Sequence, residues 1–118
     1  MTTNEKKRQR FLRDPLPVRL GGLAATLGRI SSSAREGSEP ATTRCLIEEA
    51  RHMIEWTAAD AEPEAAAELV LVQRQLTLWQ NVWEAACQDR RQRVLLSVQA
   101  KIWSDRALAL SGLLDPTP

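Results

Sequence analysis

The fold is decided by residues 69–114, which read LVLVQRQLTLWQNVWEAACQDRRQRVLLSVQAKIWSDRALALSGLL. Apolar residues recur there at intervals of three and four, as one face of a 3.6-residue helical period requires. The two resulting stripes are Leu69, Val72, Leu76, Trp79, Trp83 and Ala86, and then Leu96, Ala100, Trp103, Ala107, Leu110 and Leu114. The stripes meet at Asp89, so we expect an antiparallel helix pair with Trp79, Trp83 and Trp103 as its aromatic centre.

Capping and terminating residues set the ends of these helices and of two earlier ones. Asp14 and Asp89 are the residue type that caps helix amino termini, and Asp89 has the spacing of a capping box to Gln92. Gly37 and Gly112 stand where helices end. Because the links are short, neighbouring helices should run antiparallel. We expect an all-α, up-down antiparallel bundle of about four helices, covering residues 14–35, 40–58, 62–87 and 90–111.

The first of these helices contains an unusual strip of small residues. Its apolar stripe includes Leu20, Leu23 and Leu27, and Gly21 and Gly28 lie beside that stripe. Each glycine weakens a helix by about 1 kcal/mol relative to alanine. The strip therefore indicates either close backbone packing against a neighbour or a helix that is marginal on its own.

Length and composition predict one domain. A chain of 118 residues with 43% hydrophobic and 26% charged residues can bury a core without metal or disulfide staples. We expect a helical domain over residues 14–114, a flexible basic arm over 1–13 and a tail over 115–118. No apolar run is long enough for a membrane span or signal peptide, which predicts a cytoplasmic location with Cys45 and Cys87 as buried, reduced thiols.

Charge is segregated along the chain, although the formal net charge is only +1. Residues 1–35 carry eight basic and two acidic residues, whereas residues 36–70 carry nine acidic and two basic residues. Complementary potentials of this kind steer docking and suppress wrong partners. The pattern favours salt-sensitive association with another protein or with a second copy.

The candidate partner-binding residues belong to the basic amino-terminal segment: Lys6, Lys7, Arg8, Arg10, Arg13 and Arg19. The same residues could contact phosphates, but Phe11 is the only aromatic residue among them, which makes nucleic acid an unfavoured partner. Peripheral contact with an anionic membrane is a further alternative. The simplest alternative is that the arm lies across the acidic second helix or extends into solvent.

One short motif points to a metal. Glu49 and His52 form a Glu-x-x-His element, the spacing that in ferritin-like proteins directs a carboxylate and an imidazole at one iron. In a dimer two such elements could face one another, with Glu68 as an added ligand. A solvated histidine between Glu48 and Glu55 is the preferred interpretation, so we expect no metal and no other cofactor.

Catalysis is not expected. With one histidine in the chain, neither a Ser/His/Asp nor a Cys/His arrangement is plausible. No glycine-rich loop follows a strand to hold a phosphate, and the paired carboxylates lie on a charged face without an apolar wall. We expect neither enzymatic activity nor a small-molecule substrate.

A set of short motifs resembles a family of short, uncharacterised proteins from cyanobacteria. These motifs are LPVRLGGLAA at residues 16–25, GRI at 28–30, IEWTAAD at 54–60 and LSGLL at 110–114. The resemblance covers about residues 11–114 and implies an all-helical cytoplasmic protein without known activity, cofactor or catalytic residues. Together the observations predict a non-catalytic interaction module that docks through its basic amino-terminal segment and its acidic second helix.

Overall fold

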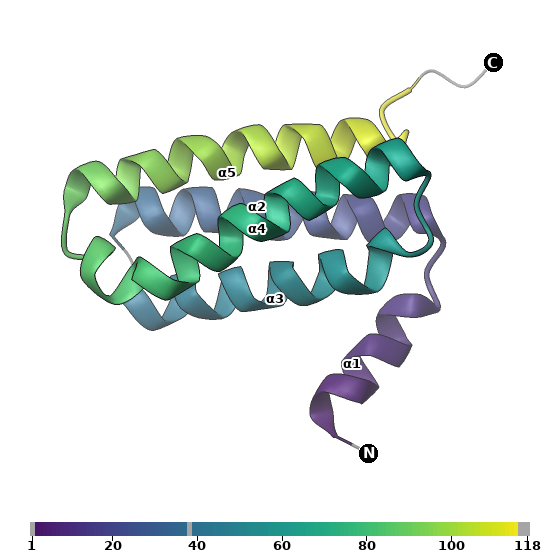
Figure 1. The fold of residues 1–118 in the computed structure, drawn as a ribbon, viewed down its shortest axis with the longest axis horizontal. Coiled ribbons are helices and arrows are strands. Elements are labelled where there is room, and N and C mark those ends of the chain that lie inside the picture. Colours follow the sequence, from purple (N-terminus) through teal and green to yellow (C-terminus); the bar gives the residue numbers. More distant parts are fainter. Residues whose placement is uncertain (1, 38, 116–118) are drawn as a thin grey trace.

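The computed structural model describes residues 2–37 and 39–115, and every regular element in this part of the chain is a helix (Figure 1). The all-helical prediction is confirmed. Four expected helices are present with ends within two residues of the predicted ones, and a fifth precedes them. The helices are α1 (Thr3–Leu12), α2 (Leu16–Glu36), α3 (Pro40–Ala58), α4 (Pro63–Ala86) and α5 (Arg90–Ser111). None of them is long and apolar enough to cross a membrane.

Helix α1 corrects the expectation of an arm without regular structure over residues 1–13. Thr2 caps it, because the hydroxyl oxygen accepts a hydrogen bond from the Glu5 amide at 3.1 Å. Glu5 lies in the first turn and Arg10 in the last, which suits the helix dipole at both ends. Thr2 and Glu5 have the spacing of a capping box, a signal that apolar periodicity does not contain. Of the predicted tail, residues 116–118 lie outside the described residues.

The predicted helix ends are correct at three of four key positions. Gly37 and Gly112 adopt the left-handed conformation with φ of 68° and 72°, which ends α2 and α5. The Asp89 carboxylate accepts a hydrogen bond from the Arg91 amide at 2.8 Å and so caps α5. Asp14 does not cap α2, because the helix begins later, after Pro15, with no side-chain cap.

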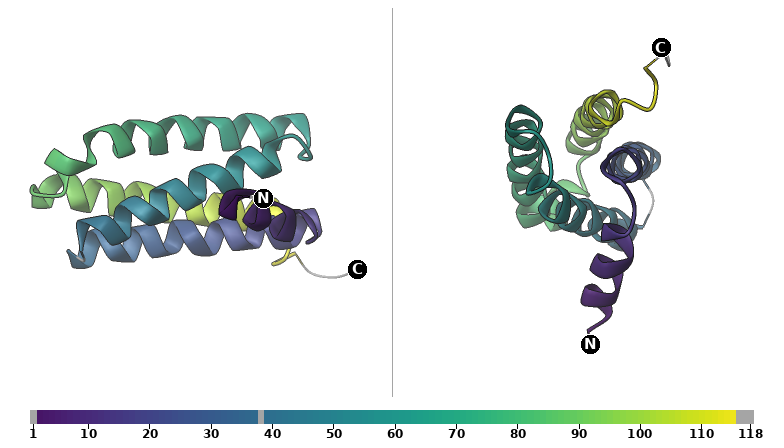
Figure 2. Two further views of the ribbon diagram at one scale, coloured as in Figure 1. Left: turned by 90° about the horizontal axis from the view of Figure 1, so that it is seen from below. Right: turned by 90° about the vertical axis from the view of Figure 1, so that its right-hand side faces the viewer.

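Helices α2 to α5 lie side by side, and α2 contacts both α3 and α5 (Figures 1 and 2). It packs most extensively on α5 and also on α3, while α3 packs on α4. The sequence predicted that α4 and α5 form a pair. In the structure these two helices contact each other less than α5 contacts α2 or α4 contacts α3. The apolar stripes of α4 and α5 both face a shared core that includes α2, rather than mainly each other.

Small residues explain why α5 prefers α2. The Ser104 hydroxyl donates a hydrogen bond to the carbonyl oxygen of Ala24 at 2.7 Å, and the Ser31 hydroxyl donates one to the carbonyl oxygen of Ser97 at 2.8 Å. A Cβ placed on Gly28 would lie 3.5 Å from the Ser104 oxygen. Such contacts need backbones that approach closely, which bulky side chains would prevent. The glycines of α2 differ in how tightly they are packed: a Cβ on Gly21 would lie 2.8 Å from Leu113 Cδ1, whereas the surroundings of Gly28 have room for one.

The core is mostly aliphatic and also contains two tryptophans. Trp79 and Trp83 are buried, and their indole nitrogens donate hydrogen bonds to the side chain of Gln99 and to the carbonyl of Pro40. Trp103 is only partly buried. Among the described residues, none of these three rings pairs with another, so the predicted aromatic centre is not formed. The bonds of the two buried indoles tie α4 to different neighbours instead.

Candidate functional site

A cleft of about 580 Å³ opens between α1 and α3. Helix α1 projects away from the other helices, as Figure 1 and the end-on view in Figure 2 show. Among the described helices it contacts mainly α3, and this contact is small. The cleft takes Lys7, Arg10 and Phe11 from α1, and Cys45, Glu48, Glu49, His52 and Trp56 from α3. Cys45, Glu49, His52 and Trp56 recur at intervals of three and four residues along α3 and form one wall of this cleft.

Three residues that line the cleft have rings that contact one another. The Phe11 ring lies 5.8 Å from that of Trp56, centroid to centroid, with the planes tilted by 53°. The His52 ring stacks on that of Trp56, with 5.5 Å between the ring centroids and 17° between the ring planes. The edge contact and the stacked contact are both favourable arrangements for such rings. Phe11 is thus the residue that holds α1 against α3.

The two walls of the cleft carry opposite charge. Lys7 and Arg10 stand on the α1 side, while Glu48 and Glu49 stand on the α3 side. All four side chains are exposed, and no ion pair joins α1 to α3 within the described residues. The basic helix therefore lies near the acidic one without being neutralised by it, and both charges remain available to another molecule.

The six predicted partner-binding residues divide into two groups. Five are exposed, on α1 or at its end: Lys6, Lys7, Arg8, Arg10 and Arg13. Arg19 is buried, and its guanidinium group donates to the carbonyl oxygen of Asp14 at 3.1 Å and to the carboxylate of Asp60 at 3.0 Å. Arg19 therefore fastens the start of α2 to the end of α3 and is not displayed to a partner.

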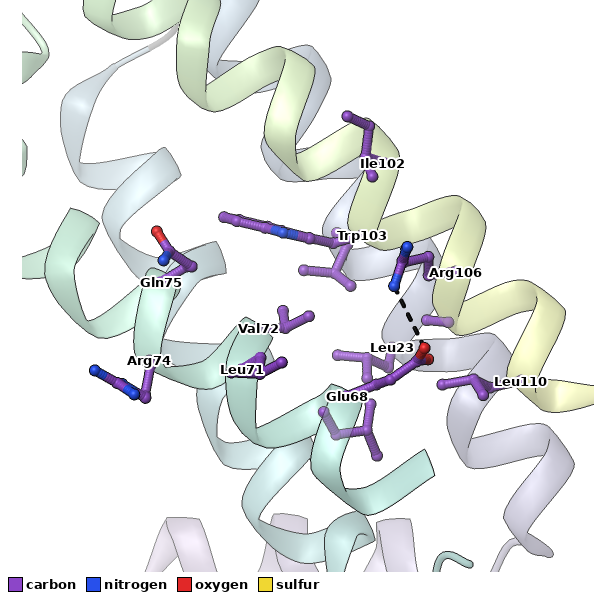
Figure 3. Close-up of a pocket in the computed structure, with 13 residues that line it drawn as sticks. Leu23, Glu68, Leu71, Val72, Arg74, Gln75, Ile102, Trp103, Arg106 and Leu110 are labelled. Atoms are coloured by element: carbon purple, nitrogen blue, oxygen red, sulfur yellow. Dashed lines mark hydrogen bonds and ion pairs between the residues drawn. The ribbon is translucent and has the colours of Figure 1, made fainter. Parts of the chain in front are cut away.

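The three residues of the alternative metal site are not gathered within one chain. His52 lies between the carboxylates of Glu48, at 3.9 Å, and Glu55, at 3.7 Å, as the preferred interpretation expected. Glu68 instead lines a groove between α4 and α5 and pairs with Arg106 at 3.3 Å (Figure 3). In the described ranges, no group of three or more His, Cys, Asp or Glu residues could hold a metal ion. A dimeric site built on Glu49 and His52 stays a prediction.

The cysteines are free thiols, but their predicted burial is wrong. Cys45 is exposed at the mouth of the cleft, and Cys87 is partly buried at the end of α4. Cys45 lies off the apolar stripe of α3, on the same flank as His52, which explains its exposure. A stripe of mixed polar and apolar residues therefore faces the cleft rather than the core.

The functional residues missed by sequence reasoning are Phe11 and Trp56 as a contacting pair. Each was assigned to a different unit, one to a mobile arm and one to the flank of α3, so no spacing rule could bring them together. Comparison with known proteins adds no further assignment: no family model, curated protein or solved structure matches this chain.

Proposed function

We propose that this protein is a non-catalytic interaction module that docks on another protein through α1 and the adjoining acidic face of α3. In this proposal α2 to α5 form an up-down antiparallel four-helix bundle that serves as a rigid base. The contacts of Ser31 with Ser97 and of Ala24 with Ser104 support antiparallel packing of α2 and α5, since residue numbers fall along one helix as they rise along the other.

The single observation that carries the proposal is that α1 contains no buried residue. A helix of ten residues is marginal in water by itself, because the cost of nucleation is repaid by few hydrogen bonds. The contact between Phe11 and Trp56 anchors only one end of α1. A partner that covers the remainder would supply the missing stabilisation.

The chemistry of α1 defines the surface that it fits. Lys6, Lys7, Arg8 and Arg10 give it a dense positive charge, and all four are exposed. An acidic protein surface would meet this charge, raise the association rate and make the binding sensitive to salt. Glu48 and Glu49, across the cleft, would reject a basic partner and so help to set the orientation.

The test compares two charge-reversed variants that differ only in location. The first changes Lys6, Lys7 and Arg8 to Glu, and its control changes three exposed arginines elsewhere, Arg35, Arg44 and Arg74, to Glu. Each immobilised chain is exposed to extract from the source cells at low and high salt, and the captured proteins are quantified by mass spectrometry. We expect the wild type and the control to retain the same acidic protein at low salt, and the α1 variant to lose it. Equal capture by both variants would show that α1 does not bind the partner.

Membrane-surface or nucleic-acid association through α1 is the alternative that the same variants address. Phe11 and Leu12 are the only large apolar residues of α1, and both are partly buried, which leaves little to insert into a bilayer. Flotation with anionic vesicles and a mobility-shift assay at two salt concentrations measure these alternatives directly. If the wild type binds vesicles or nucleic acid and the α1 variant does not, that ligand, and not an acidic protein, is the partner of α1.

A further inference from the structure

An exposed face of α4 and α5, beside their core stripes, is unusually apolar. Six aliphatic side chains on it are each between 45% and 60% exposed. They recur at intervals of three, four and seven residues, so those of each helix lie on one face. We call these residues the aliphatic face: Leu71, Leu78 and Val82 of α4, and Leu95, Val98 and Ile102 of α5.

The aliphatic face is about as large as the largest apolar patch that a monomer usually leaves in water. Six half-exposed aliphatic side chains present on the order of 500 Å² of apolar surface, near the upper end of the range for the largest patch on a monomeric protein. A standard protein interface buries roughly 800 Å² on each partner. The aliphatic face together with a surrounding polar rim reaches that size, so its area suits a stable dimer.

The aliphatic face has a hollow at one end, where α4 and α5 diverge. This groove has a volume of about 470 Å³, with Leu71 and Ile102 on its two sides and Leu23 and Leu27 of α2 among the residues that line it. Figure 3 shows Trp103 extending from α5 toward α4 across the groove, beside the ion pair of Glu68 and Arg106. At the other end, Val82 and Leu95 stand outside the groove as exposed side chains. One chain therefore offers both a hollow and a set of projecting side chains.

Charged residues flank the aliphatic face with opposite sign at its two ends. Glu64 and Glu68 precede Leu71 on the same stripe of α4, where Glu68 is already paired with Arg106 of α5, and Arg91 precedes Leu95 on the same stripe of α5. Because α5 begins just after α4 ends, Arg91 lies at the end opposite to the two glutamates. A two-fold axis through the middle of the face would place the acidic end of one copy against the basic end of the other.

We propose that the aliphatic face is the interface of a symmetric homodimer in which Glu64 of each copy faces Arg91 of the other. The same two-fold axis brings the projecting Val82 and Leu95 of one copy over the groove of the other. The aliphatic middle, with Glu64 and Arg91 at its opposite ends, favours a second copy of this chain over an unrelated partner, because both features belong to one surface. This interface is separate from α1 and α3, and it goes beyond the proposed docking function.

The first test measures the mass of the full chain by sedimentation velocity over a range of concentrations. We expect the wild type to be a dimer at micromolar concentration. Leu78→Glu and Val98→Glu place charges in the middle of the interface and should each raise the dissociation constant at least 100-fold. The matched control is Val18→Glu, an exposed aliphatic residue of α2, which should leave the dimer intact. All three sites are exposed, and circular dichroism establishes that each variant keeps its helices.

The second test distinguishes the proposed orientation from any other dimer. Glu64→Arg and Arg91→Glu should each weaken the dimer about tenfold, since each puts like charges together. The chain that carries both changes should recover the wild-type dissociation constant, because the pair is restored with its signs exchanged. A wild-type chain that stays monomeric at 100 micromolar would overturn the proposal, as would a dimer unaffected by Leu78→Glu. Lack of recovery in the double variant would overturn the orientation. The α1 charge reversal should leave the dimer unchanged, so failure here is separable from failure of the docking proposal.

Discussion

Replacing Gly28 by alanine tests the close contact of α2 with α5 most directly. Gly28 lies inside α2, where alanine is favoured over glycine by about 1 kcal/mol in the free energy of unfolding. The added Cβ would meet the Ser104 hydroxyl oxygen at 3.5 Å, an ordinary van der Waals distance. We therefore expect Gly28→Ala to raise the free energy of unfolding by roughly 0.5–1 kcal/mol, or a few degrees in Tm.

Two further substitutions bracket this expectation. Gly28→Leu adds atoms that the contact cannot hold and should lower the free energy of unfolding by about 1–3 kcal/mol through overpacking. Gly37→Ala forces a side chain into the left-handed conformation at φ 68° and should lower it by about 1 kcal/mol. Urea denaturation followed by circular dichroism measures all three. A loss of stability with Gly28→Ala would contradict the 3.5 Å clearance at Gly28, and equal effects of alanine and leucine there would refute the inference that the two helices pack closely.

Three other substitutions probe contacts between the remaining helices. Trp83→Phe removes the indole donor to the first carbonyl of α3, so urea denaturation should show a loss of about 1–2 kcal/mol in the free energy of unfolding. In the same assay, Arg19→Met should lower the free energy of unfolding by about 1–2 kcal/mol. Asp60→Asn should lower it by less than about 1 kcal/mol, because the carboxylate is 55% exposed. Equal losses would mean that the ion pair, rather than the contacts of Arg19 with backbone carbonyls, contributes most. Phe11→Ala should release α1 from α3 without lowering Tm. A red shift of Trp56 fluorescence would show this release, and an unchanged spectrum would contradict the anchoring role of the Phe11 ring.

The helix ends could be predicted because their signals are local. Gly37, Asp89 and Gly112 act within one turn of their own positions, and the structure confirms all three. Helix α1 was not predicted because residues 1–13 lack apolar periodicity, whereas Thr2 and Glu5 form its cap without any apolar residue. Local chemistry thus decided where helices begin and end more reliably than the stripe pattern did.

The choice of neighbours could not be predicted in the same way. Every long helix has an apolar stripe, and a stripe does not say which other stripe it meets. The preference of α5 for α2 depends on Ser97 and Ser104, which read as polar interruptions in the sequence but act as small contact residues. Likewise, helical spacing placed His52 and Trp56 on one flank, but Phe11 reaches them only because α1 is a helix.

The pairing of α2 with α5 has a consequence for how the chain is made on the ribosome. The partners of Ala24 and Ser31 are residues 104 and 97, so α2 must wait for most of the polypeptide to emerge before its apolar side is covered. Contacts between segments so far apart in the sequence slow folding and leave apolar surface exposed during translation. Premature termination anywhere ahead of α5 would leave a fragment with an uncovered stripe, prone to aggregate or to be captured by chaperones.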